Sequence, residues 1–159
     1  MKKIIVILTA ILALSVCANA QRQSVTYLSG GVITRISDWT NLYPGATLAV
    51  GFRNYNQDAF VSFTYGAEAM AYWVPENGSN IFGAFAIPAL GVAIGPRGFK
   101  VLPHAGFMAG YGNYGGSPFQ IGSKFGVTFD IGNHISLDFS NYYTRINPWM
   151  SAINFIYRF

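Results

Sequence analysis

Charge is scarce in this sequence. Asp, Glu, Lys and Arg together make up 10% of its 159 residues, whereas soluble domains usually carry about 25%. So few charges would leave a water-facing surface poorly covered. Of the 10 basic residues, Lys2 and Lys3 stand at the N-terminus, and without them 8 basic residues remain against 6 acidic ones. No Lys/Arg cluster is left that could follow a phosphate backbone, so we expect no nucleic-acid partner.

Cysteine and metal-binding patterns are also missing. Cys17 is the only cysteine, which excludes an intrachain disulfide framework. His104 and His134 stand thirty residues apart, on segments that we predict to be different strands. The sequence has neither metal-ligand spacing nor a glycine-rich phosphate loop. We therefore expect no metal and no cofactor.

The first twenty residues have the three parts of a secretory signal peptide. Lys2 and Lys3 give a positive start, residues 4–16 are almost continuously apolar, and Ala18-Asn19-Ala20 gives the small-x-small cleavage pattern. A membrane anchor is the alternative, but the apolar run falls short of the roughly 20 residues that a spanning helix needs. A lipoprotein box ending at Cys17 is a second alternative, disfavoured by the bulky Val16. The sequence predicts a signal peptide at 1–20 and one domain at 21–159.

After residue 20, long hydrophobic runs are absent, which excludes a transmembrane helix. The chain is nevertheless 52% hydrophobic and 16% aromatic, and it contains 18 glycines. A protein that is apolar overall without helix-length apolar runs fits a membrane β-barrel, whose strands alternate apolar-out and polar-in.

The strongest pattern has a period of two residues. In 119–131 one face carries Phe125, Val127 and Phe129, and the other carries Lys124, Thr128 and Asp130, while Ser123 alone interrupts the apolar face. Such alternation indicates a strand and not a helix. Similar alternation predicts eight strands, at 25–36, 47–53, 59–73, 81–94, 99–112, 119–131, 134–143 and 151–159.

The predicted connections alternate between long and tight. Residues 37–44, 75–80, 113–118 and 145–149 form the longer ones, and 54–58, 95–98 and 132–133 the tight ones. With both termini periplasmic, the longer loops would lie outside. A two-residue turn at Gly132-Asn133 would place inward Asp130 opposite outward Ile135, so we predict a three-residue turn or a bulge there.

Two prolines complicate the middle of the chain. Pro88 and Pro103 fall inside predicted strands, and each removes one backbone donor from the ladder. We expect a bulge, or an outward-facing break near a strand end, at these positions.

The C-terminus carries a family resemblance. Phe159 ends the chain, with Tyr157, Phe155 and Ile153 at every second position before it. This resembles the terminal-strand signature of outer-membrane barrels, and the mature chain resembles the small eight-stranded OmpA/OmpX-type barrels in length and layout. The resemblance implies an all-β, eight-stranded antiparallel up-and-down transmembrane β-barrel in the outer membrane of a Gram-negative bacterium. It implies outer-membrane lipid, lipopolysaccharide and the barrel-insertion machinery as partners.

The interior of such a barrel is just wide enough for side chains to fill, or to hold one small ligand. Because opposite charges in a low-dielectric lumen must pair, we predict a polar network inside. Arg53, Lys100 and Arg158 are further inward candidates, and inward glycines such as Gly106 and Gly126 leave a small cavity open. The predicted network consists of Glu68, Lys124, Asp138, His104 and Asp130.

One short motif resembles the lipid A deacylase barrels, which carry His-x-Ser-Asn on a late strand and a downstream acid. Here Ser140 matches the nucleophile and Asn141 the following amide, but Asp138 stands where the histidine base belongs, and no acid follows it. A carboxylate at its usual pKa is a poor base for a serine hydroxyl. We therefore predict no catalytic activity, with a degenerate deacylase-like barrel as one alternative.

The function predicted from the sequence is a structural, adhesion or binding role with a side-chain-filled lumen. The rival is a narrow channel or carrier for a small or apolar molecule. An extracellular ligand could bind through the loops, where Trp39, Tyr43, Tyr114 and Trp149 lie near the outer rim or form the interface girdle. A soluble lipocalin-like barrel is the rival fold, but it would need charged outer faces.

Overall fold

The computed structural model describes residues 23–38, 41–76, 78–113, 118–144 and 149–159. The predicted signal peptide at 1–20 and the rim aromatics Trp39 and Tyr114 lie outside these ranges. Across the described residues, no helix is long and apolar enough to cross a membrane.

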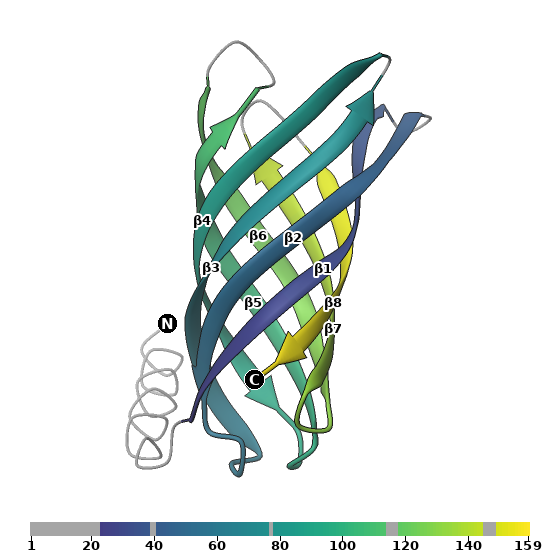
Figure 1. The fold of residues 1–159 in the computed structure, drawn as a ribbon. Coiled ribbons are helices and arrows are strands. Elements are labelled where there is room, and N and C mark those ends of the chain that lie inside the picture. Colours follow the sequence, from purple (N-terminus) through teal and green to yellow (C-terminus); the bar gives the residue numbers. More distant parts are fainter. Residues whose placement is uncertain (1–22, 39–40, 77, 114–117, 145–148) are drawn as a thin grey trace, which may run out of the picture.

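Eight strands form one closed antiparallel barrel in chain order, as Figure 1 shows. The last strand pairs with the first, between Tyr27↔Arg158 and Arg35↔Met150. Closure matters because hydrocarbon offers no partner for an open strand edge. The fold class predicted from the sequence is confirmed. The strands are β1 (Gln23–Asp38), β2 (Asn41–Tyr55), β3 (Val61–Glu76), β4 (Ser79–Ile94), β5 (Phe99–Gly112), β6 (Phe119–Ile131), β7 (Ile135–Thr144) and β8 (Met150–Arg158).

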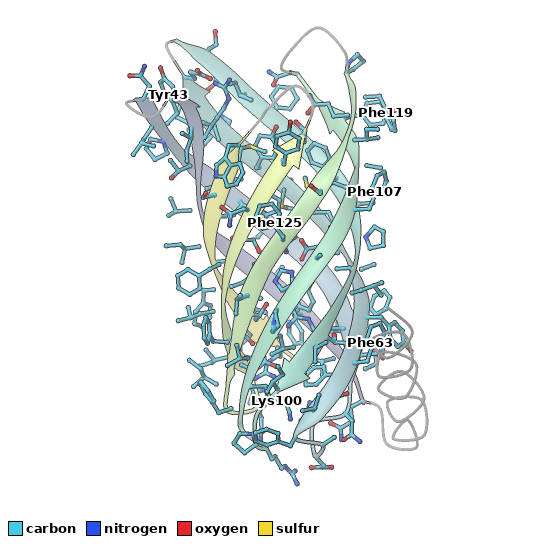
Figure 2. All side chains as sticks on the ribbon, turned by 180° about the vertical axis from the view of Figure 1, so that it is seen from behind. Tyr43, Phe63, Lys100, Phe107, Phe119 and Phe125 are labelled. Carbon is cyan, nitrogen blue, oxygen red and sulfur yellow. The ribbon has the colours of Figure 1, made fainter. Side chains whose placement is uncertain are left out.

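The outer wall is apolar, and the alternation of exposure matches the period-two pattern. In β8, Ile153 and Phe155 are half exposed, whereas Asn154 and Ile156 between them are buried. Aromatic side chains project from the outer surface in Figure 2. An apolar outward face is what a wall in contact with lipid requires.

The predicted tight turn between β6 and β7 contains three residues. Ile131 pairs with Ile135, so Gly132, Asn133 and His134 form the turn and both strands keep their faces. Gly132 has a φ of 65°, a left-handed conformation that glycine adopts without steric cost. The prediction of a three-residue turn is confirmed.

Most of the described residues in two of the predicted long loops are strand instead. The β1–β2 ladder continues to Asp38↔Asn41, and the β3–β4 ladder continues to Glu76↔Ser79. Side-chain pairs stabilise these extended hairpins: Arg35 pairs with Glu76, and Trp73 Nε1 donates to Asn80 Oδ1 at 3.0 Å. The loop boundaries predicted at 37–44 and 75–80 were therefore wrong. These hairpins extend beyond the apolar part of the outer wall, where polar residues and prolines interrupt the alternation of side chains but do not end the strand.

Pro88 and Pro103 produce no bulge. Both side chains face outward, and the β4–β5 register is the same on both sides of each proline, from Ala86↔Ala109 through Gly91↔His104 to Ile94↔Val101. The ladder only skips the pairs around the prolines, where the donor is missing. The predicted bulge was therefore wrong. The alternative, an outward-facing break in the ladder, is what the structure has, although Pro88 lies in the middle of β4 and not near its end.

Candidate functional site

The lumen is the candidate site, and its half nearest the extended hairpins is apolar. Tyr72 and Phe85 stack there with ring centroids 6.0 Å apart, and Tyr43 packs against the same group instead of facing the rim. We call this group the apolar plug; it contains Ile33, Ala49, Met70, Tyr72, Val74, Ile81, Phe85, Ile87, Met108, Tyr142, Met150 and Ala152.

Next to the plug lies a polar group centred on Lys124. Lys124 Nζ lies 2.6 Å from Glu68 Oε1 and 3.7 Å from Asp138 Oδ2. The Tyr27 hydroxyl donates to the other oxygen of Glu68 at 2.8 Å. All three charged side chains are buried, so each charge depends on the others to offset its desolvation. β6 supplies the cation, and β3 and β7 supply the two carboxylates.

Asp138 accepts most of the remaining hydrogen bonds of this group. Its Oδ1 lies 2.8 Å from His104 Nε2 and accepts from the Thr128 hydroxyl at 2.8 Å. Its Oδ2 accepts from the Ser140 hydroxyl at 2.6 Å. A buried carboxylate with these donors around both oxygens is well satisfied. We call Glu68, Lys124, Asp138, His104, Tyr27, Thr128 and Ser140 the central cluster.

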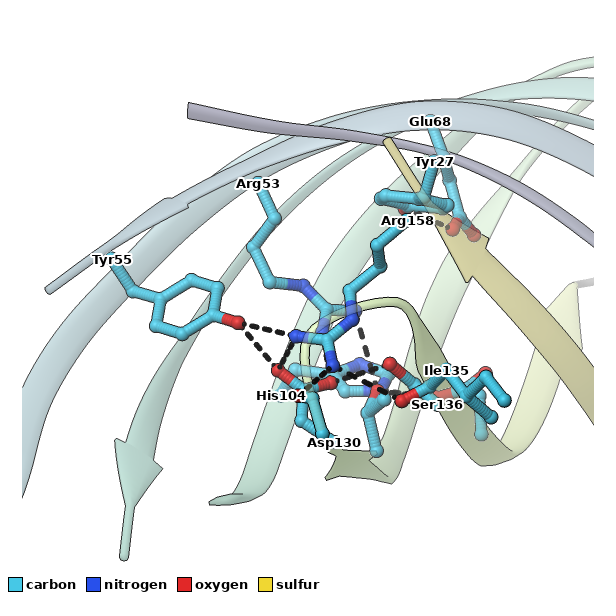
Figure 3. Close-up of polar contacts among 12 residues, drawn as sticks. Tyr27, Arg53, Tyr55, Glu68, His104, Asp130, Ile135, Ser136 and Arg158 are labelled. Carbon is cyan, nitrogen blue, oxygen red and sulfur yellow. Dashed lines mark hydrogen bonds and ion pairs between the residues drawn. The ribbon is translucent and has the colours of Figure 1, made fainter. Parts of the chain in front are cut away.

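A second polar group lies at the tight-turn end, and Asp130 belongs to it. Arg158 Nη1 donates to Asp130 Oδ2 at 2.9 Å and to the Tyr55 hydroxyl at 2.9 Å. Tyr55 and Ser136 donate to the two Asp130 oxygens at 2.5 and 2.7 Å, as Figure 3 shows. We call Arg158, Asp130, Tyr55 and Ser136 the tight-turn cluster.

Arg53 joins the two clusters. Its Nη2 donates to Thr128 Oγ1 at 3.3 Å, and its Nη1 lies 4.0 Å from Asp130 Oδ1. The structure thus brings Glu68, Lys124, Asp138 and His104 together, and places Asp130 in a separate cluster one step away. Lys100 lies opposite Asp130 in the β5–β6 ladder, but its ammonium donates to the carbonyls of Ala59 and Gly95 at 2.6 and 2.8 Å, where it ties two turns together.

The cavity left by the inward glycines is very small. A Cβ on Gly126 would lie 2.6 Å from Ser140 Oγ, and one on Gly106 would lie 2.9 Å from Ile87 Cγ2. Neighbouring side chains therefore occupy the space that the glycines leave. The cavity beside Tyr27, Glu68, His104 and Lys124 measures about 20 Å³, which is room for about one water molecule.

The deacylase-like motif does not form a triad. Ser140 is 1% exposed inside the lumen, and its hydroxyl donates to Asp138, while His104 lies on the other oxygen of that carboxylate. The carboxylate separates the hydroxyl from the imidazole, so no base is placed to take the serine proton. Asn141 faces the opposite side of the wall.

The terminal aromatics lie on the outer face. Phe159 is 73% exposed, and its N–H donates to the Thr26 carbonyl at 2.9 Å. Tyr157 packs edge-to-face against Phe159, with centroids 5.2 Å apart, and stacks on His134. Phe155 is also exposed, two residues earlier on the same face.

Sequence reasoning missed the tyrosines of the lumen. Tyr27 and Tyr55 donate to buried carboxylates, but aromatic residues in a barrel pattern are assigned to the lipid face by default. The alternation of faces could have identified them. Tyr27, for example, stands two residues before Ser29 and so shares its face of β1, and both side chains are buried. The Arg35–Glu76 pair was missed because Glu76 was placed in a loop.

Comparison with known proteins gives a fold match and no sequence family. No protein-family model matches the sequence, and no curated protein matches it. Among solved structures, the barrel is similar to the outer membrane enzyme PagL, with a TM-score of 0.57 and 12% identity over 86% of this chain and 98% of that one. The specific resemblance to OmpA/OmpX-type barrels has no support from these comparisons.

The match also corrects one prediction. From the sequence we predicted no catalytic activity, yet the fold is shared with an enzyme of the outer membrane, so that prediction is wrong. At this identity the likeness establishes the shared fold and transfers no residue roles. The chain has an eight-stranded fold of the outer-membrane type.

Proposed function

We propose that this chain is an integral outer-membrane barrel that serves as a membrane-embedded binding protein, with its lumen closed by side chains. The filled lumen carries this proposal. The apolar plug occupies the half nearest the extended hairpins, and the two polar clusters, joined by Arg53, occupy the rest. The surfaces open to a partner are then the outer wall and the extended hairpins.

A channel is the rival that the filled lumen disfavours. The cavity of about 20 Å³ beside the central cluster is lined by paired charges, and the stacked rings of Tyr72 and Phe85 lie in the plug next to it. Purified protein in planar bilayers is expected to give no conductance steps. A general porin added to the same bilayer is the positive control, and regular single-channel steps from this protein would overturn the closed lumen.

An enzyme acting on membrane lipid is the second candidate, and the similarity to an outer membrane enzyme is the observation that favours it. The central cluster does not support hydrolysis, so such activity would need groups on the outer wall. Mass spectrometry of lipopolysaccharide from cells with and without the gene tests this candidate. Loss of an acyl chain only in cells carrying the gene would establish it, and an unchanged acylation pattern would remove lipid A as a substrate.

Assembly in the outer membrane is proposed to depend on the terminal aromatics. Phe159→Ser is expected to lower the amount of folded barrel in cells several-fold, because it removes the exposed terminal ring. Refolding in detergent should change little, since the ring contacts only Tyr157 among the described aromatic pairs. Phe60→Ser, at another highly exposed ring that lies in a turn, is the control. Equal cellular yields for both variants would contradict the proposed signal.

A further inference from the structure

An open groove crosses the outer wall over β4, β5, β6 and β7. It measures about 670 Å³. Its floor is low because Ala105 lies between the larger Leu90 and Phe125 in one register row, and Pro103 lies in the next row. Phe139 borders the groove on β7. Apart from one end and from His104, whose side chain bonds to Asp138 in the lumen, the side chains around it are apolar.

Asn141 forms that polar end of the groove. Its side chain faces outward, and its Oδ1 accepts a hydrogen bond from the Ser151 hydroxyl at 2.7 Å. Among the described residues no acceptor is bonded to Asn141 Nδ2. With its oxygen engaged, Asn141 offers the groove N–H donors, and an amide donor left unpaired against hydrocarbon is costly.

The depth of Asn141 matches the acyl linkages of a lipid. Tyr143 is the next outward residue on β7, and Trp149 packs edge-to-face on Phe125 with centroids 5.8 Å apart; both rings are exposed. Tyr and Trp of this kind mark the membrane–water interface. Two residues along a strand span about 7 Å, so Asn141 lies just below the headgroup level, where ester and amide carbonyls are found.

We propose that this groove binds one acyl chain of a membrane lipid, with the carbonyl of the chain's ester or amide linkage accepting a hydrogen bond from Asn141 Nδ2. The inference rests on the proposed membrane location. A lipid chain is favoured over a second copy of the barrel because the groove is concave, whereas a barrel wall is convex. The donor at one end and the apolar floor beyond it match a carbonyl followed by a hydrocarbon chain.

The test uses native mass spectrometry of the purified barrel in detergent, with added ester-linked diacyl phosphatidylethanolamine or its ether-linked analogue, which lacks the carbonyls. Wild type is expected to retain the ester lipid roughly three- to tenfold better than the ether lipid, as for one hydrogen bond. Asn141→Leu should abolish that preference, and Ala105→Phe should lower retention of both lipids by filling the floor. Ala86→Phe, also an outward alanine but outside the groove, should behave as wild type.

Folding is checked for each variant by its gel shift on boiling, and Ala105→Leu replaces Ala105→Phe if the larger ring prevents folding. A wild-type protein whose gel mobility does not change on boiling would contradict the proposed function itself. A folded wild type that holds ester and ether lipids equally, or a loss that Ala86→Phe shares, would overturn the groove alone. A dimer that Ala105→Phe disrupts would assign the groove to a second copy instead.

Discussion

Replacement of Lys124 by Met is expected to lower the free energy of unfolding by about 3–5 kcal/mol, the range for breaking a buried ion pair by removing one partner. Lys124 Nζ is the cation nearest to Glu68, at 2.6 Å, and it also lies 3.7 Å from Asp138. Without it, Glu68 keeps only the Tyr27 hydroxyl as a described side-chain donor. Urea titration of the barrel refolded in lipid vesicles, followed by tryptophan fluorescence, measures the change.

Two further variants make this result specific. Arg97→Ala breaks an ion pair with Asp58 whose side chains are 75% and 53% exposed, and it should change stability by less than about 1 kcal/mol. Glu68→Gln added to Lys124→Met should recover part of the loss, since it removes the charge left unpaired. Equal stability of Lys124→Met and wild type would show that the central cluster is not a buried charge network.

Val50→Arg is expected to cost about 2–4 kcal/mol, the range for a cationic side chain on the lipid face at the bilayer midplane. Val50 is 52% exposed and lies midway along the stretch of β2 that pairs with β3, from Ala46 to Asn54. The apolar wall on either side of it offers no polar group to receive the charge. The same urea titration in vesicles gives the value.

Depth provides the control for Val50→Arg. Phe60 is 64% exposed but lies in the turn before β3, so Phe60→Arg should cost about 0–1 kcal/mol, as near an interface. A similar small cost at both positions would mean that the outer wall faces water, as in a lipocalin-like barrel.

The strands could be predicted from the sequence because outward side chains all face lipid and inward side chains all face the lumen. In β6 and β8, lipid selects Phe125, Phe129, Ile153 and Phe155, while the lumen takes Lys124 and Asn154, so parity alone assigns faces. The register argument at Gly132 worked for the same reason, since a slip of one residue would have turned Asp130 toward lipid.

The extended hairpins and the lumen contacts were not readable. Pro44 and Pro75 lie in strands above the apolar belt, where alternation no longer reports a membrane face. Tyr55 faces inward although it is aromatic, because its hydroxyl reaches Asp130 across the barrel. Such contacts between distant strands depend on barrel closure, and a linear pattern contains no record of them. Asp130 was predicted in one network with Lys124 but lies in a separate cluster, and this difference also depends on how the strands are arranged around the closed barrel.

Cell fractionation combined with gels of boiled and unboiled samples tests the closed transmembrane barrel most directly. The protein is expected in the outer-membrane fraction, and its mobility should change on boiling because a hydrogen-bonded barrel resists detergent until it is heated. Recovery as a detergent-free, water-soluble species whose mobility is the same before and after boiling would contradict the membrane barrel.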